Sequence, residues 1–220
     1  MKIFLYLLFV GGWIFCNPML IHASLFQEKK CSECHRLSND EAEKNGPDLF
    51  YAGNKYQASW LKQYLQNPIT IRRAWGVRDP GFLNGIPANT QKHIALPKEE
   101  AEQISKELMV LMPLDLPKEV DLLMPLTNGQ KAKIKYQFER TFGCISCHQS
   151  LNLAGKVRGG ISGPSLVNAG NRLQARWIES WLKNPKIFTN KSRMPIYKME
   201  GEVRLKLTQF LMTLKNENKR

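Results

Sequence analysis

The chain contains the run C-x-x-C-H twice, as CSECH at residues 31–35 and CISCH at residues 144–148. On a helical turn the positions i, i+3 and i+4 share a face, so the two cysteines and the histidine of each run are expected to project together. This spacing is the attachment signature of c-type haem. The two sulfurs can form thioethers to the haem vinyl groups, and the histidine can reach the iron as its proximal ligand.

The sequence therefore predicts two covalently bound c-type haems. The residues assigned to them are Cys31, Cys34, Cys144 and Cys147 for the thioethers and His35 and His148 for the iron. A structural zinc site is an alternative, but 109 residues separate Cys34 from Cys144, far more than a zinc ribbon allows. Structural disulfides and a thioredoxin-like site are further alternatives; the latter needs a βαβ context that the sequence does not show.

A longer stretch of the chain is also repeated. Residues 46–68 align without a gap to residues 163–185 at an offset of 117, and 12 of these 23 positions are identical. The C-x-x-C-H runs are offset by 113, so the second copy has four extra residues between His148 and Gly163. Internal repeats indicate duplicated structural units. We therefore expect two haem-binding domains in tandem.

Each copy contains two predicted amphipathic helices. The first helix has apolar residues at i, i+1, i+4 and i+5 and ends at an Asn-Pro pair, because the residue before proline avoids the α region. Its apolar residues are Trp60, Leu61, Tyr64 and Leu65 in the first copy and Trp177, Ile178, Trp181 and Leu182 in the second. A later helix closes each copy, beginning at Pro97 in the first and containing Val203 to Leu214 in the second. The predicted fold class is all-α.

With these features the chain resembles the di-haem class I cytochromes c, which have two small helical domains in tandem. The resemblance rests on C-x-x-C-H, then Gly-Pro-x-Leu, then Trp-(Leu/Ile)-x-x-(Tyr/Trp)-Leu-x-Asn-Pro and a terminal helix. It implies that Pro47 orients His35, and that Pro164 orients His148, through a proline carbonyl that accepts the Nδ1 proton of the histidine. Such a bond fixes the tautomer and makes the imidazole a stronger ligand.

In this family a methionine before the last helix usually binds the other face of the iron. The second copy has Met194 nine residues after Pro185, and the resemblance assigns it as the distal ligand of the second haem. A thioether is a soft, uncharged ligand that favours ferrous iron and raises the reduction potential. Met199 is the neighbouring alternative.

The first copy departs from this pattern. Its loop after Pro68 is longer, contains no methionine, and places Gln91 opposite Met194 when the terminal helices are aligned. His93 lies two residues away, and we assign it as the distal ligand of the first haem. The alternatives are Met112, Met124 and an iron without a sixth protein ligand.

The N-terminus predicts export. Lys2 is the only charged residue before Glu28, and an apolar run follows it directly. A short basic start with such a run is typical of a signal peptide, here with cleavage near Ala23. An uncleaved membrane anchor is the main alternative, and a lipoprotein signal through Cys16 is a weaker one. We expect a periplasmic protein, with anchoring by the N-terminus as the second option.

The net charge is +13, which concerns partners and encounter rates rather than the fold. An exported chain meets little nucleic acid, so the expected partners are acidic redox proteins, with a membrane respiratory complex as a further option. The loop at 71–90 carries three arginines and could cover the first haem, dock a partner or be solvated.

These expectations divide the chain into four parts: a signal peptide or anchor at 1–23, a first cytochrome c domain at 24–112, a connector at 113–130 and a second cytochrome c domain at 131–220. The expected function is the transfer of single electrons between redox partners, without catalysis. One alternative is a tightly bound di-haem subunit of a membrane respiratory complex. Another is a haem sensor or peroxidase-like protein whose first haem is open.

Overall fold

The computed structural model describes residues 24–73, 93–116, 125–152, 154–189 and 192–216. The predicted signal segment, Met124 and most of the loop at 71–90 lie outside these ranges. In the first copy the helices are α1 (Leu25–Glu28), α2 (Cys31–Cys34), α3 (Ala52–Lys55), α4 (Ala58–Gln66) and α6 (Lys98–Met109). In the second copy the elements are α7 (Asn128–Tyr136), the π-helical turn η1 (Gln137–Thr141), the 3₁₀ turn η2 (Cys144–Ser146), β1 (Gln149–Leu151), β2 (Val157–Gly159), α8 (Ala169–Arg172), α9 (Ala175–Lys183), the 3₁₀ turn η3 (Pro185–Ile187) and α10 (Gly201–Met212).

Three helices of the first copy have counterparts of equal length in the second. The bounds of α3 and α8, and those of α4 and α9, differ by the same 117 positions as the aligned sequences. The terminal helices α6 and α10 both have 12 residues. The amphipathic pattern explains α4 and α9, which bury Trp60, Leu61 and Leu65 and their counterparts Trp177, Ile178 and Leu182. Both helices end directly before the Asn-Pro pair, as predicted, with Asn67 and Asn184 as their C-caps.

A glycine lets the terminal helix approach closely in each copy. A Cβ atom on Gly53 would lie 2.2 Å from the carbonyl oxygen of Met109, and one on Gly170 would lie 2.1 Å from that of Met212. The same glycines donate their N–H groups to the carbonyls of Leu111 and Leu214, at 3.0 and 2.9 Å. The end of each terminal helix is therefore fastened to the short helix α3 or α8 at the same point.

The expected all-α fold is correct for the helices but misses a β-hairpin. Strands β1 and β2 pair antiparallel, with Gln149 opposite Gly159 and Leu151 opposite Val157. The hairpin lies between His148 and Gly163, where the second copy has its four extra residues. Helix α7 begins within the segment expected to be the connector, and Thr127 caps it with a capping box completed by Gln130.

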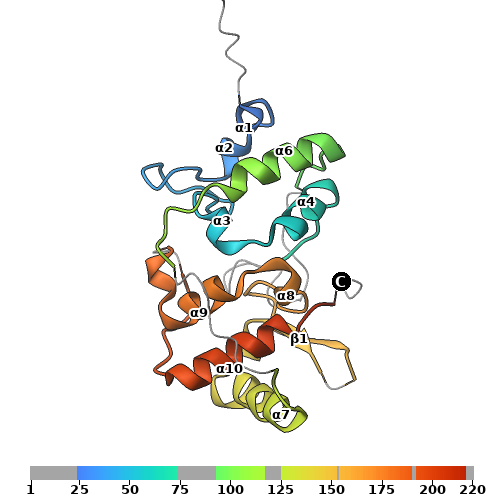
Figure 1. Ribbon diagram of the computed structural model, residues 1–220, viewed down its shortest axis with the longest axis vertical. Helices are drawn as coiled ribbons and strands as arrows, with labels where there is room; N and C mark the ends of the chain where they lie inside the picture. Colours follow the sequence, from blue (N-terminus) through green and yellow to red (C-terminus); the bar gives the residue numbers. More distant parts are fainter. Residues whose placement is uncertain (1–23, 74–92, 117–124, 153, 190–191, 217–220) are drawn as a thin grey trace, which may run out of the picture.

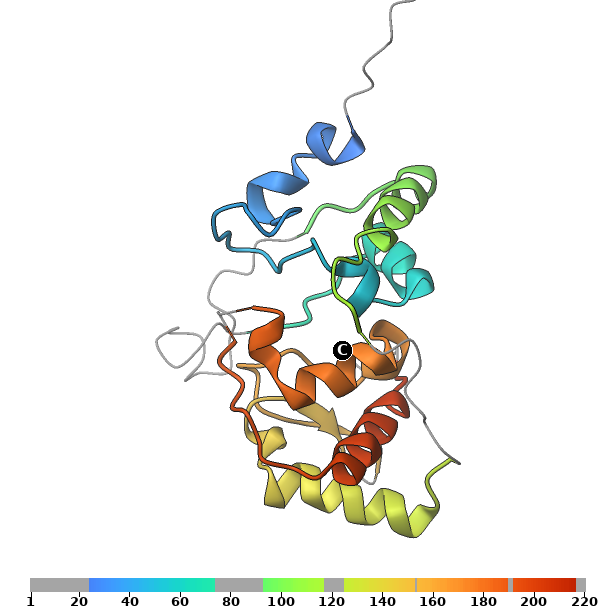
Figure 2. The same cartoon turned by 60° about the vertical axis from the view of Figure 1, so that its left-hand side comes forward.

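The two copies stack along the long axis of the molecule, with α6 and α4 in one half and α9, α10 and α7 in the other (Figures 1 and 2). Their contact is reciprocal. The Gln57 N–H donates to the carbonyl of Arg172, and the N–H of its counterpart Gln174 donates to the carbonyl of Lys55, both at 2.9 Å. Each pair joins equivalent positions of the repeat, which is the pattern of a two-fold interface between like units.

The side chains at this contact repeat the exchange. The Gln57 amide donates to the carbonyl of Leu173 at 3.1 Å, and the Gln174 amide donates to the carbonyls of Tyr56 and Gly53 at 2.7 and 2.8 Å. Tyr56 and Leu173 also form an isolated β-bridge. Within the described ranges, none of the helices is long and apolar enough to cross a membrane.

Candidate haem sites

Both C-x-x-C-H runs form a single tight turn that starts from a left-handed residue. Cys31–Cys34 is one α-helical turn and Cys144–Ser146 is a 3₁₀ turn. His35 follows its turn in an extended conformation. The preceding residues, Lys30 and Gly143, have φ values of +55° and +62°. Glycine adopts this conformation without strain, whereas a side chain at Lys30 has a steric cost.

The proximal histidines are held in the same way in both copies. The Nδ1 atom of His35 lies 2.8 Å from the carbonyl oxygen of Pro47, and Nδ1 of His148 lies 2.7 Å from that of Pro164. This is the hydrogen bond that the family resemblance implies. When Nδ1 carries the proton it donates to the carbonyl, and Nε2 is left as the nitrogen that can bind a metal.

A glycine before each proline leaves room for the ring. A Cβ atom on Gly46 would lie 2.7 Å from Nδ1 of His35, and one on Gly163 would lie 2.6 Å from Cε1 of His148. The two glycines also donate their N–H groups to the carbonyls of Cys34 and Cys147, each at 2.7 Å. The Gly-Pro pair therefore packs its backbone against the histidine ring and bonds to the C-x-x-C-H run at two points, the histidine Nδ1 and the carbonyl of the second cysteine.

The environment keeps both imidazoles neutral, which is the form that binds a metal. Burial is the main cause of the lowered pKa of His35, and the nearby His93 lowers this pKa further. The hydrogen bond to Pro47 acts in the opposite direction and raises it. Burial also lowers the pKa of His148, against the hydrogen bond to Pro164.

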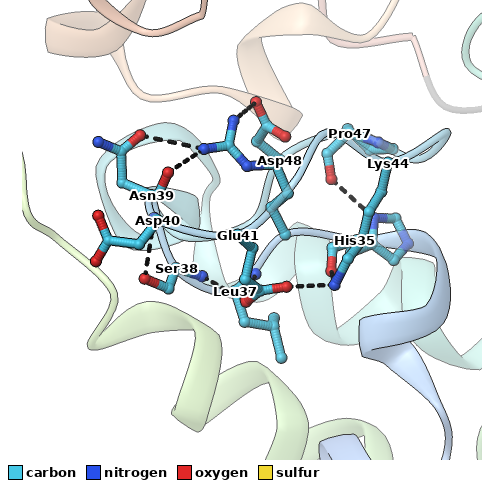
Figure 3. A network of polar contacts seen from close by, with 10 residues as sticks. His35, Leu37, Ser38, Asn39, Asp40, Glu41, Lys44, Pro47 and Asp48 are labelled. Carbon is cyan, nitrogen blue, oxygen red and sulfur yellow. Dashed lines mark hydrogen bonds and ion pairs between the residues drawn. The ribbon is translucent and has the colours of Figure 1, made fainter.

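The segment between the proximal histidine and the Gly-Pro pair differs between the copies. In the first it is a loop held by polar contacts (Figure 3): the Glu41 carboxylate accepts from the N–H groups of Leu37 and Ser38, and Lys44 bonds to Glu41 and to the carbonyl of His35. Arg36 forms an ion pair with the buried Asp48 in the same loop. In the second copy the β-hairpin takes the place of this network.

His93 lies close to the proximal histidine of the first copy. The ring centroids of His35 and His93 are 6.1 Å apart. Two histidine rings that share one metal have centroids roughly 6 Å apart, because a metal–nitrogen bond is about 2.1 Å and each nitrogen is about 1 Å from its ring centre. Nδ1 of His93 lies 2.8 Å from the carbonyl oxygen of Ile94, so Nε2 is the available nitrogen in both rings.

Met194 occupies the corresponding position in the second copy. The indole N–H of Trp181 donates to the sulfur of Met194 at 3.1 Å. Trp181 is the repeat counterpart of Tyr64, and the ring of Tyr64 lies 5.5 Å from that of His93. The same position of α4 and α9 therefore contacts the expected distal ligand in both copies. Tyr64 is buried enough to raise its pKa to about 12.

The alternative ligands lie elsewhere or have other contacts. Met112 is half exposed and lies between the copies, with its sulfur 3.8 Å from the Arg176 guanidinium and its Cγ near Gly53. It fits the interdomain contact better than a place on the iron. Met199 packs at the edge of the core. Met124 lies outside the described residues.

The thiols do not form the alternative sites considered for them. The four described cysteines are free, and within the described ranges no three His, Cys, Asp or Glu side chains gather as a metal cluster would require. Burial raises the pKa of Cys144 to about 11 and also raises that of Cys31, the opposite of the shift in a reactive redox thiol.

Two buried groups of the second copy, Arg172 and Trp177, are donors for which haem would bring acceptors. Arg172 is buried, and none of the ion pairs among the described residues includes it; its guanidinium donates to the carbonyl of Ser165 at 2.8 Å. The buried indole nitrogen of Trp177 has no hydrogen-bond partner. Buried cations and donors normally have partners, and haem carries two carboxylates. The two cysteines and the histidine of each C-x-x-C-H run fit a c-type haem, and so do Arg172 and Trp177 beside the second run.

Residues 23–106 match the family model of cytochrome c. The match covers the first copy, which contains CSECH, the Gly-Pro pair, α4 and most of α6, but less than half of the chain. A cytochrome c domain is therefore present in the first half, and such a domain binds haem covalently and transfers electrons with it. No curated protein and no solved structure matches the chain.

Sequence reasoning missed three features of these sites. Tyr64 and Trp181 were recognised as apolar stripe residues, not as neighbours of the distal ligands. Arg172 was not singled out, because a basic residue also stands at the matching position of the first copy, Lys55. The arginine-rich loop was expected to cover the first haem, dock a partner or be solvated, and its contact with the second copy was not foreseen. Arg72, near its beginning, donates to the carbonyl of Ser162 at 2.9 Å; Trp75 and Arg78 lie outside the described residues.

Proposed function

We propose that the protein is an exported di-haem cytochrome c that passes single electrons between redox partners. The observation that carries the proposal is the duplicated proximal arrangement: a C-x-x-C-H turn, a glycine against the ring, and a histidine Nδ1 bonded to a proline carbonyl, once in each copy. The family match supports the first site directly. Only the repeat and its shared geometry support the second.

In this proposal the chain supplies the covalent anchors and the ligands of both sites. The thioethers form at Cys31 and Cys34 and at Cys144 and Cys147. When bound, haem supplies a one-electron iron couple. The residues around it set the potential through the axial ligands, the hydrogen bonds and the exclusion of water.

The distal ligands favour a carrier over an enzyme. His93 and Met194 give each iron a sixth protein ligand, and a six-coordinate iron has no free position for a small molecule. The position of His93 beside His35, with its Nδ1 occupied by a carbonyl, supports this assignment.

Mass spectrometry of protein matured with the haem-attachment machinery tests the proposal. We expect two haem additions to the mature chain, and Cys147→Ala should remove one thioether of the second site only. One addition, at Cys31 and Cys34, would reject the di-haem assignment and leave a single cytochrome c domain. No addition would reject the proposal as a whole.

Carbon monoxide binding to the reduced protein separates a carrier from a sensor or peroxidase-like protein. We expect neither haem to bind it readily. Rapid binding by the unmutated first haem would favour the small-molecule function. Cell fractionation tests the location: the proposal expects the haem protein in the periplasm, or in the membrane if the N-terminus remains as an anchor.

A further inference from the structure

The positive charge of the chain lies almost entirely in its second half. Residues 24–116 contain 12 Lys or Arg and 12 Asp or Glu, so their formal charge is zero. Residues 125–220 contain 18 Lys or Arg and 5 Asp or Glu, a formal charge of +13. Two haem carboxylates in each domain would lower both values equally, so the asymmetry would persist.

The ion pairs of the structure preserve this asymmetry at the surface. In the first half six described cations form ion pairs within the domain: Lys29, Lys30, Arg36, Lys44, Lys62 and Lys106. In the second half the described pairs use Lys135, Arg158, Arg204 and Lys206 and occupy three of the five acids. Most of the described cations of the second half take part in none of these ion pairs.

Several of these cations surround the attachment turn of the second haem. We name Arg140, Arg193 and Lys198 the basic rim; all three are exposed. Arg140 lies in η1, which contacts η2, four residues before Cys144.

The other two rim residues reach the same turn from the segment before α10. The ring of Tyr197, next to Lys198, packs edge-on against that of Phe142, two residues before Cys144, with the ring centroids 5.6 Å apart. Arg193 donates to the carbonyl of Ser162, beside the glycine that bonds to Cys147. The rim therefore lies around the place where the second haem is attached.

An apolar residue lies within the same segment. Ile196 is 50 % exposed between Arg193 and Lys198, and Cys147 at the attachment turn is exposed as well. A small apolar contact bordered by charge is typical of brief electron-transfer encounters, in which charge speeds association and a small interface allows release.

We propose that an acidic redox protein docks on the second domain, over the basic rim and Ile196, and that the neutral first domain does not take part in this contact. The inference rests on the proposed function and adds to it which haem exchanges electrons with the acidic partner. The first haem then exchanges electrons with a partner that does not depend on charge steering.

Two variants of equal net charge test the proposal in the full di-haem protein. The first carries Arg140→Gln and Lys198→Gln on the basic rim, and the control carries Lys98→Gln and Lys106→Gln on α6. All four side chains are exposed. The probe is flavodoxin, a small acidic electron-transfer protein, and its reaction with each variant is followed by stopped-flow absorbance.

We expect the rim variant to react roughly 5-fold more slowly than the unmutated protein at low ionic strength, and the control less than about 2-fold more slowly. The difference should vanish near 1 M salt, where the Debye length is about 3 Å. The cationic reagent hexaammineruthenium should react with both variants at similar rates, which excludes damage to the haem.

Equal slowing of both variants would overturn the proposal, because net charge rather than position would then decide the rate. Greater slowing of the control would place the contact on the first domain and overturn it as well. Failure of the proposed function has a different signature, since a chain without two haems is recognised from its absorption spectrum before any kinetic measurement.

Discussion

The two copies agree on the proximal side of the haem sites and differ on the distal side. His35 and His148 have the same hydrogen bond to a proline carbonyl, and Gly46 and Gly163 leave the same space for the ring. On the other side, His93 in the first copy stands where Met194 stands in the second. Both are contacted by the same position of the repeat, as Tyr64 or Trp181.

This difference shows which features the repeat can change. The proximal side depends on backbone atoms and on glycines without space for a Cβ, so most substitutions there would displace the histidine. The expected distal ligand is one side chain on a loop segment, and a change there from histidine to methionine would leave α4, α6 and their counterparts unaltered.

Loss of a distal ligand should have the largest effect. Histidine is the better donor to ferric iron, so we expect the first haem to have the lower potential, by on the order of 0.1 V within the roughly 0.8 V range that axial ligands set. Met194→Ala should abolish the methionine-to-iron charge-transfer band. His93→Ala should keep that band and make the first haem high-spin and open to carbon monoxide.

A redox titration with ferric spectra checks this pair of variants. A first haem that stays low-spin in His93→Ala would show that His93 is not the ligand. A charge-transfer band that survives Met194→Ala would move the assignment to Met199.

The glycines beneath the terminal helices should have the next largest effect, and an equal one in both copies. Gly53→Ala and Gly170→Ala each place a Cβ against a backbone carbonyl, at 2.2 and 2.1 Å, which cannot move aside as a side chain can. We expect each to lower the free energy of unfolding by about 3 kcal/mol. Gly129→Ala on α7 is the control, because its Cβ meets nothing within 4 Å, and it should stabilise by about 0.5 kcal/mol.

Denaturant titrations of the three glycine variants give these values. If Gly53→Ala were tolerated while Gly170→Ala was not, the close approach of the terminal helix would be a property of the second copy alone.

The interdomain glutamines should show a smaller and unequal effect. Gln174 donates two amide hydrogen bonds to the first copy and Gln57 donates one to the second. With about 1 kcal/mol for each bond, Gln174→Ala should cost about 2 kcal/mol and Gln57→Ala about 1 kcal/mol. Equal losses in denaturant unfolding would mean that the interface is symmetric in energy as well as in backbone geometry.

The smallest expected effect is at the left-handed residue before each attachment turn. Lys30→Gly removes a steric strain that Gly143 does not have. Glycine also adds entropy to the unfolded chain, which offsets part of this gain, so we expect the free energy of unfolding to rise by up to about 1 kcal/mol. Gly143→Lys should destabilise by about 1 to 2 kcal/mol. Thermal unfolding of both variants checks the sign; a stabilising Gly143→Lys would show that the turn does not need this conformation.

Much of this architecture was predictable because it depends on local patterns. The offset of 117 correctly predicted that α4 and α9 share their bounds, since apolar spacing and the Asn-Pro stop are local signals. The hairpin between His148 and Gly163 was not predicted. It is formed by three-residue strands in a short insertion, too short to show a strand periodicity.

The sequence by itself was enough to predict the thioether cysteines and the proximal histidines, because the chemistry of each attachment turn is contained in five consecutive residues, and it shows the repeat directly. Only the tertiary structure decided three other matters: that His93 lies beside His35, that Tyr64 and Trp181 contact His93 and Met194, and that Gln57 and Gln174 join the copies reciprocally. Each of these contacts joins residues distant in the chain, and such residues meet only when the helices pack, so no local pattern of residues encodes the contact.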